Sequence, residues 1–281
     1  MAAVGHYQEY ERFFKLPHCI RCLLSAFPLL FVLNNGTNAS AVTLEELSNT
    51  VAYLREGNGI GTGFFVQAEH PFLVTAEHVA QHLTATSLIT VRASGDKPIQ
   101  LTIGELVPGL KVLPWVRHLE GDVAVLRLFS IERLGFVEQR FFSGQLLPSR
   151  EAAPAHEISV TVMGFPLALG TVGRFSPISS EAKAASGLLR LNRFDTRKEA
   201  TFFVLDKPSV GGFSGAPVFL LPQPTFKEGT LSVPGSNNPA ICVGLVHGTL
   251  SDDTGGKFAA VVPASVIVET ITSAGGKFQS R

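Results

Sequence analysis

Residues 210–219 read VGGFSGAPVF, and this stretch sets one serine hydroxyl, that of Ser214, among three glycines. The apolar residues that follow predict a β-strand. Glycine is unfavourable in a strand because it has no side chain to pack and loses much conformational freedom on folding. The three glycines therefore indicate a backbone that turns tightly or comes close to another group. Two interpretations fit: a structural β-turn, or a nucleophile whose neighbouring N–H groups reach a substrate.

The composition of the chain predicts a globular protein rich in short strands. Of its 281 residues, 45% are hydrophobic and 16% are charged, which is enough apolar material for a sizeable core and argues against disorder. The formal net charge is zero and no basic run stands out, so we expect no nucleic-acid partner. The 27 Gly and 17 Pro lie between short apolar runs, a pattern that favours strands and turns over long helices.

The segment 1–41 differs from the rest of the chain. Basic residues precede the apolar run Leu23–Leu33, which is too short to span a bilayer as a helix. The run fits the central region of a secretory signal peptide, and Ala39–Ala41 offers a cleavage site with small residues. We therefore predict a signal peptide and an exported protein, periplasmic or secreted. The alternatives are a membrane anchor or a helix packed on the domain, which would make the protein membrane-tethered or cytoplasmic.

The cysteines indicate neither a zinc site nor a disulfide. Cys19 and Cys22 have the spacing of a metal-binding pair, but no second pair or histidine cluster accompanies them, and both fall in the segment that signal cleavage would remove. Cys242 would then remain, and its apolar neighbours predict a buried thiol that packs as a small hydrophobic group. We expect no metal and no disulfide, so the stability of the mature chain has to come from its core.

From residue 50 onward the chain is a series of strand candidates. Short β-rich runs separated by Gly, Pro, Asp or Asn occur at 61–67, 71–76, 87–94, 99–107, 122–129, 158–166, 187–194, 200–206, 216–221, 241–248 and 258–263. About eleven short strands on one chain suggest barrels or a sandwich. The polar stretch 144–156 could join two β-lobes, and 222–240 is predicted as a surface excursion. The run 263–274 predicts a helix, with Pro263 in its first turn and Gly275 as a stop.

A histidine and an aspartate stand in settings that suit Ser214. A serine hydroxyl is a weak nucleophile unless a base takes its proton, and the base is usually a histidine oriented by a buried carboxylate. His78 follows the apolar run 71–76, so its side chain is expected at the rim of a sheet, where sites are built. Asp122 leads directly into an apolar strand, where a charge is costly unless a group such as a histidine N–H pairs with it.

Three short blocks resemble a known family. TAEHV, DVAVLRL and GGFSGAP resemble the signature blocks of the chymotrypsin-fold (trypsin-like) serine proteases, in that family's order and at gaps that suit its fold. GTGFFV and VMGFP are similar to the bacterial trypsin-like branch. The resemblance covers roughly residues 50–272. It implies an all-β fold with two β-barrels of the six-stranded type and a C-terminal helix.

The same resemblance implies domain limits and an activity. The peptidase domain would cover 42–281, with one lobe at about 45–145, a second at about 155–262 and the C-terminal helix at about 263–274. The active site would lie between the lobes. The implied function is a serine endopeptidase that hydrolyses peptide bonds in peptide or protein substrates through an acyl-enzyme intermediate, without a cofactor. The alternative is a pseudoprotease of the same fold that binds peptides or a partner without cutting them.

The family roles transfer to individual residues. Ser214 would be the nucleophile, His78 the general base and then the general acid, and Asp122 the residue that orients His78. The backbone N–H groups of Gly212 and Ser214 would form the oxyanion hole. In this interpretation the glycines beside Ser214 keep side chains away from the substrate and let the backbone N–H groups point into the site.

Departures from the family pattern concern activation and specificity. Phe213 stands where digestive members carry an aspartate that pairs with a freed N-terminus, so that switch is not expected. Pro208 stands where an acidic specificity residue would lie, so we predict poor cleavage after Lys and Arg and a preference for small or apolar residues. His247 could instead reach the substrate pocket and bind Glu or Gln, or it could be a hydrogen-bonded core histidine near Asp122. Thr249 is predicted to line the same pocket.

Overall fold

The computed structural model of the protein describes residues 43–130, 141–222, 225–227, 230–232 and 239–278. The signal or anchor segment predicted at 1–41, with its two cysteines, lies outside these residues. No helix in the described ranges is long and apolar enough to cross a membrane.

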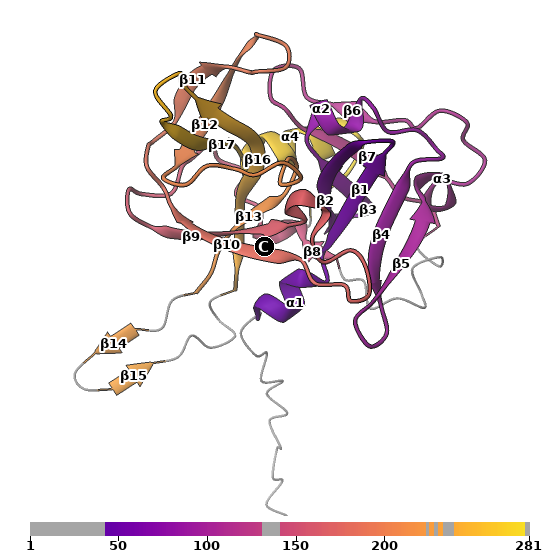
Figure 1. The fold of residues 1–281 in the computed structure, drawn as a ribbon, viewed down its shortest axis with the longest axis horizontal. Coiled ribbons are helices and arrows are strands. Elements are labelled where there is room, and N and C mark those ends of the chain that lie inside the picture. Colours follow the sequence, from indigo (N-terminus) through magenta and orange to yellow (C-terminus); the bar gives the residue numbers. More distant parts are fainter. Residues whose placement is uncertain (1–42, 131–140, 223–224, 228–229, 233–238, 279–281) are drawn as a thin grey trace, which may run out of the picture. The chain divides into compact units, whose positions relative to one another are not determined.

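The described chain is dominated by short strands (Figure 1). In chain order the elements are α1 (Leu44–Ser48), β1 (Val51–Glu56), β2 (Gly59–Gln67), β3 (Pro71–Thr75), α2 (Glu77–Ala80), β4 (Leu88–Ala93), β5 (Lys97–Thr102), α3 (Ile103–Leu106), β6 (Val116–Arg117), β7 (Ala124–Arg127), β8 (Phe142–Ser143), the 3-10 helix η2 (Gly144–Leu146), β9 (Ser159–Gly164), the 3-10 helix η3 (Pro166–Ala168), β10 (Ile178–Lys183), β11 (Leu189–Asn192), β12 (Glu199–Leu205), β13 (Pro217–Leu220), β14 (Thr225–Lys227), β15 (Thr230–Ser232), β16 (Ile241–Ser251), β17 (Lys257–Pro263) and α4 (Ala264–Ser273).

The first half of the domain forms an eight-stranded sheet. Its order is β5-β4-β1-β2-β3-β7-β6, all antiparallel, and β8 adds in parallel to β2. Successive residues of one strand point to opposite faces, and here both faces are buried. On β2, Phe64 packs in a core shared with the second sheet and α4, while Phe65 packs in a separate core made only by the first half. This double burial explains the nearly continuous apolar pattern of β2 and β3.

The second half forms a seven-stranded sheet in the order β10-β9-β13-β16-β17-β12-β11. An isolated bridge between Ala184 and Leu205 joins the end of β10 to β12, so the six strands from β10 to β12 close on themselves. Its own core includes Phe203, Val218 and Val261. β14 and β15 form a separate two-stranded sheet in the long connection between β13 and β16.

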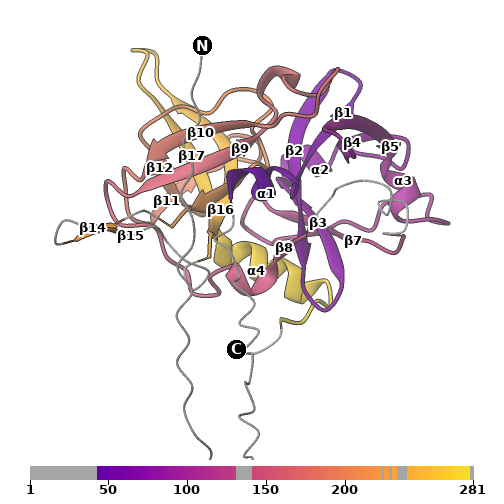
Figure 2. The same cartoon turned by 90° about the horizontal axis from the view of Figure 1, so that it is seen from below.

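The C-terminal helix α4 contacts strands of both sheets (Figure 2). Pro263 precedes it, and its buried face carries Val266, Ile267 and Ile271, which join the shared core. This burial fixes the helix against β6 and β7 of the first sheet and β16 and β17 of the second. The predicted fold class, all-β with two barrel-like lobes and a C-terminal helix, is confirmed: the described chain is mostly β, with two largely antiparallel sheets and the helix α4.

Individual elements differ from the sequence prediction. The strand predicted at 99–107 is wrong in its second half, because β5 ends at Thr102 and α3 follows. Thr102 and Glu105 form a capping box, in which the Glu105 carboxylate accepts the Thr102 N–H at 2.7 Å. The sequence pattern also missed β1, whose Ala, Leu, Arg and Glu favour helices, and β10, whose serines, glutamate and lysine give little apolar signal.

Candidate active site

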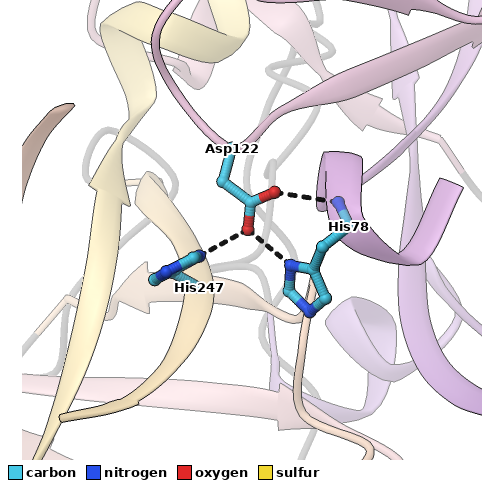
Figure 3. Close-up of side chains that lie close together, drawn as sticks. All are labelled: His78, Asp122 and His247. Carbon is cyan, nitrogen blue, oxygen red and sulfur yellow. Dashed lines mark hydrogen bonds and ion pairs between the residues drawn. The ribbon is translucent and has the colours of Figure 1, made fainter. Parts of the chain in front are cut away.

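His78 and Asp122 lie side by side because of strand pairing. His78 is in α2, which begins directly after β3, and Asp122 precedes β7. Since β3 pairs with β7, with Thr75 at the end of β3 opposite Ala124 at the start of β7, the segments that carry His78 and Asp122 lie next to each other. Asp122 Oδ1 accepts the backbone N–H of His78 at 2.9 Å, and Oδ2 lies 2.7 Å from His78 Nδ1 (Figure 3). Asp122 is fully buried, while the His78 side chain keeps 14% of its surface exposed and so stays accessible.

His247 on β16 bonds to the same carboxylate from the other side (Figure 3). Its Nδ1 lies 2.6 Å from Asp122 Oδ2, and its Nε2 accepts the backbone N–H of Phe194 at 3.3 Å. A ring that accepts at Nε2 and faces a carboxylate at Nδ1 is a neutral imidazole with its proton on Nδ1. Burial would raise the pKa of Asp122, but the hydrogen bonds from His247 and His78 hold it well below its usual range.

Ser214 lies in the tight turn before β13. Its neighbour Gly215 has φ +82°, and a Cβ there would overlap the Thr62 carbonyl oxygen and crowd the backbone of Ala76. The turn therefore packs directly against the segment that leads into His78. The Ser214 hydroxyl donates to the His247 carbonyl at 3.4 Å, and among the described contacts it has no hydrogen bond to His78. Such bonds are often long in the absence of substrate.

The backbone before Ser214 is held in one orientation. Gly212 has φ +102°, and a Cβ there would overlap the Phe165 carbonyl. The Gly211 carbonyl accepts the Leu167 N–H at 2.7 Å, so the Gly212 N–H on the same planar trans peptide points the opposite way. Among the hydrogen bonds described, neither the Gly212 nor the Ser214 N–H has an acceptor in the protein. Both donors of the predicted oxyanion hole are thus available to a ligand.

Thr62 on β2 joins this turn to the first sheet. Its buried hydroxyl donates to the Gly212 carbonyl at 2.7 Å and accepts the Phe165 N–H at 3.1 Å. Its backbone N–H donates to the Ser214 carbonyl at 2.9 Å, and its carbonyl accepts the Thr75 hydroxyl at 2.7 Å. One residue therefore ties the serine turn to η3 and to the end of β3.

Three further residues at the site carried no sequence signal. Arg193 and Phe194 belong to the turn between β11 and β12, and Glu77 precedes His78. Arg193 contacts both Glu77 and Asp122. The Phe194 ring stacks on His247 at 4.3 Å between centroids and meets His78 edge-on at 5.0 Å. Arg193 and Phe194 fall at the end of the strand predicted at 187–194, which ends at Asn192 in the structure, and Glu77 lies in the block TAEHV, but nothing in the sequence marks the three as site residues.

A narrow cavity lies beside the serine turn. Its volume is about 20 Å³, and it is lined by Val162, Ser180, Ala182, Leu205, Lys207, Pro208, Ser209, Phe213, Val246 and Ala259. Of the predicted pocket residues, Pro208 is in this lining and His247 and Thr249 are not. Thr249 instead donates its hydroxyl to the Ser209 carbonyl at 2.6 Å, which fixes one wall. His247 is only 1% exposed and bonds to Asp122, so of its two predicted roles it has that of a hydrogen-bonded core histidine.

The donor atoms of His78, Asp122 and His247 lie within 4.8 Å of one another. Imidazole nitrogens and carboxylate oxygens are also donor types that bind transition metals. Here both Nδ1 atoms face Asp122 Oδ2 at hydrogen-bond distance, so an ion could bind only by displacing the protons that hold the set together. The arrangement fits a hydrogen-bonded group better than a resident metal.

Comparison with known proteins identifies a family. A family model described as a trypsin-like peptidase domain matches residues 61–223, while no curated protein matches the chain. The chain is similar to the crystal structure of Rv3671c from M. tuberculosis, a serine-to-alanine mutant in its inactive form, with 18% identity, 90% of this chain and 96% of that chain covered, and a TM-score of 0.50. The crystal structure of the active form of that protease is 16% identical, with 94% of this chain and 97% of that chain covered and a TM-score of 0.50. At these identities the structural likeness supports the fold.

Proposed function

Because the chain belongs to the trypsin-like peptidase family, we propose that it is a serine endopeptidase in which Ser214 is the nucleophile, His78 the base and Asp122 the residue that orients it. The observation that carries the proposal is the bonding of Asp122. It holds the backbone and the Nδ1 side of His78, which leaves Nε2 as the proton acceptor. The hydrogen bonds from His247 and His78 outweigh the effect of burial on the pKa of Asp122 and keep the carboxylate ionised as the imidazolium forms.

Each step of this mechanism uses a group of this chain. Ser214 Oγ attacks the carbonyl carbon of the scissile peptide while His78 Nε2 takes its proton. The carbonyl oxygen becomes an oxyanion and accepts hydrogen bonds from the Gly212 and Ser214 N–H groups. When the C–N bond breaks, His78 returns the proton to the leaving amine, and an acyl-Ser214 ester remains. Water, deprotonated by His78, then hydrolyses the ester and restores the hydroxyl.

The cavity beside Ser214 supports small or apolar side chains at the residue preceding the cleaved bond. Its volume of about 20 Å³ is little more than one water requires. Phe213, Val246 and Pro208 make much of its lining apolar, and its one charged residue, Lys207, is a cation and not an acid. An Arg buried there without a partner would carry a penalty of several kcal/mol. Since His247 is held by Asp122 outside this lining, small and apolar residues are favoured over Glu and Gln.

The decisive experiment is covalent labelling with a fluorophosphonate. The unaltered chain should be labelled on Ser214, located by mass spectrometry of peptides, and the S214A variant should not be labelled. A peptide library should then show cleavage after small or apolar residues. Absence of both labelling and cleavage would favour the pseudoprotease alternative. EDTA should leave the activity unchanged, because the proposed chemistry uses protein groups alone.

We propose an extracytoplasmic location on the basis of the signal segment predicted from the sequence. The proposal is that residues 1–41 are removed and that the enzyme acts in the periplasm or outside the cell. Mass spectrometry of the N-terminus of the protein isolated from its own cells tests this, since an intact N-terminus would support an anchor or a cytoplasmic enzyme.

A further inference from the structure

Arg193 is a buried cation at the tip of a hairpin. It follows β11 directly and begins the turn 193–198, which is closed by its N–H bond to the Lys198 carbonyl at 2.9 Å. The side chain of Arg193 is only 2% exposed, although residues in such turns are usually solvated. A charge is buried only where other groups replace its water. The partners of Arg193 therefore indicate why it is there.

The Arg193 guanidinium contacts three carboxylates and one carbonyl. It lies 2.6 Å from Asp195 Oδ2, 2.8 Å from Glu77 Oε2 and 3.2 Å from Asp122 Oδ1. Its Nη1 also donates to the Glu120 carbonyl at 3.1 Å. Burial would lower the pKa of Arg193, but Asp195, Asp122 and Glu77 hold it above its ordinary value. The hairpin turn thus holds the charged Arg193 guanidinium against α2 and against the segment before β7.

This cation touches the carboxylate that holds His78. Asp122 Oδ1 accepts from both Arg193 and the His78 backbone, and Oδ2 lies against the rings of His78 and His247. We propose that Arg193 is a positioning residue for the reaction, which fixes the Asp122 carboxylate and limits how readily His78 takes up a proton. This inference rests on the proposed function, because it concerns the same pair of residues.

The charges around the pair give the sign of the effect. The ionisable side chains around His78 and Asp122 come from several elements. Asp122 contacts His247 on β16 and Arg193 in the hairpin turn, and Arg193 contacts Glu77 on α2 and Asp195 in its own turn. Glu56 at the end of β1 and His82, which follows α2, line the cavity beside His78. A neighbouring cation disfavours the imidazolium form of His78, and neighbouring carboxylates favour it. Removal of the Arg193 charge should make His78 bind a proton at higher pH. Removal of the Asp195 charge should act in the opposite direction.

The first experiment follows the His78 ring by NMR in the S214A background, so it needs no turnover. R193M should move the titration midpoint of the ring to higher pH, and D195N should move it to lower pH. R193K is the matched control. It keeps the charge, so the midpoint should stay near that of the parent.

The second experiment measures kinetics in the otherwise unaltered chain. R193M should lower kcat by roughly 10²-fold with a smaller change in KM, and the acid limb of the kcat/KM profile should move to higher pH. R193K should restore the position of that limb but only part of kcat, because an ammonium cannot replace the planar fork of a guanidinium. Fluorophosphonate labelling of the unaltered chain tests the proposed function separately. If labelling fails, the proposed function is wrong, whereas an unchanged NMR titration in R193M contradicts only the role proposed for Arg193.

R193M leaves three carboxylates without their cation. If it does not fold, D195N decides alone, since it keeps Arg193 and removes one carboxylate. Shifts in the stated directions support the proposal. It is overturned if D195N leaves the His78 midpoint unchanged or raises it, or if a folded R193M keeps the midpoint of the parent.

Discussion

The two halves of the proposed site are held in place by different forces. On the acid–base half, buried Asp122 accepts N–H groups from His78 and Arg193 and bonds to His247, so charge and hydrogen bonds fix the geometry. On the nucleophile half, the turn around Ser214 is fixed by glycines in close backbone contact and by the neutral hydroxyl of Thr62. The difference indicates that the first half is sensitive to charge and pH, and the second to added atoms.

The largest effect should come from removing the nucleophile. S214A should lower kcat by roughly 10⁴- to 10⁶-fold, because the hydroxyl takes part in bond formation. H78A should cost about as much, and the double variant should be little worse than either alone, since the two groups act as a unit. Steady-state kinetics on a cleaved library peptide measures this, and circular dichroism checks folding. Turnover near that of the unaltered chain in S214A would remove Ser214 from the mechanism.

Removal of the Asp122 charge should lower kcat and also change how the free energy of unfolding depends on pH. D122N should lower kcat by roughly 10⁴-fold, as an amide no longer holds the reactive tautomer of His78. The folded pKa of Asp122 is depressed, so its contribution to stability is complete above the unfolded value of about 3.9 and is lost as pH falls below it.

Guanidinium unfolding from neutral to acid pH provides the measurement. The free energies of unfolding of the unaltered chain and of D122N should differ most at neutral pH and converge in acid. D253N, at an exposed position, is the control and should follow the unaltered chain. A gap that stays constant down to the lowest pH would contradict the depressed pKa.

The nucleophile half should respond to a single methyl group. G212A places a Cβ against the Phe165 carbonyl at a residue with φ +102°, so the turn has to shift and the Gly212 N–H moves. Loss of one oxyanion donor typically lowers kcat by roughly 10²- to 10³-fold. G211A is a matched control, because a Cβ at that neighbouring glycine meets no described atom within 4 Å. Equal kinetics of the two variants would show that the Gly212 geometry is unimportant.

The sequence predicted the features that depend on neighbours along the chain. His78 and Asp122 were identified from their places at strand ends, and the glycines beside Ser214 from their cost in a strand. Arg193 could not be identified in this way, since its burial is created by a turn of the second sheet folding onto α2 and Asp122. For His247 two roles stayed open. Only the register of β16 against β13 and β17 decides which way its ring points.

Thr62 connects the nucleophile half to the first sheet, and its removal should have the smallest effect of this series. T62V keeps the shape but leaves the Gly212 carbonyl and the Phe165 N–H without their buried partner, at about 1–3 kcal/mol for each group in the free energy of unfolding. T62S keeps the hydroxyl and loses only a methyl group, so it is the matched control. Because the Gly212 carbonyl is then free to rotate, kcat should fall by about tenfold in T62V, with KM less affected.

Denaturant unfolding and steady-state kinetics of both variants provide the measurement. If T62V and T62S unfold at the same denaturant concentration and turn over equally fast, the turn is fixed by the glycine contacts alone, and the tie between the two sheets at Thr62 has no part in holding the nucleophile.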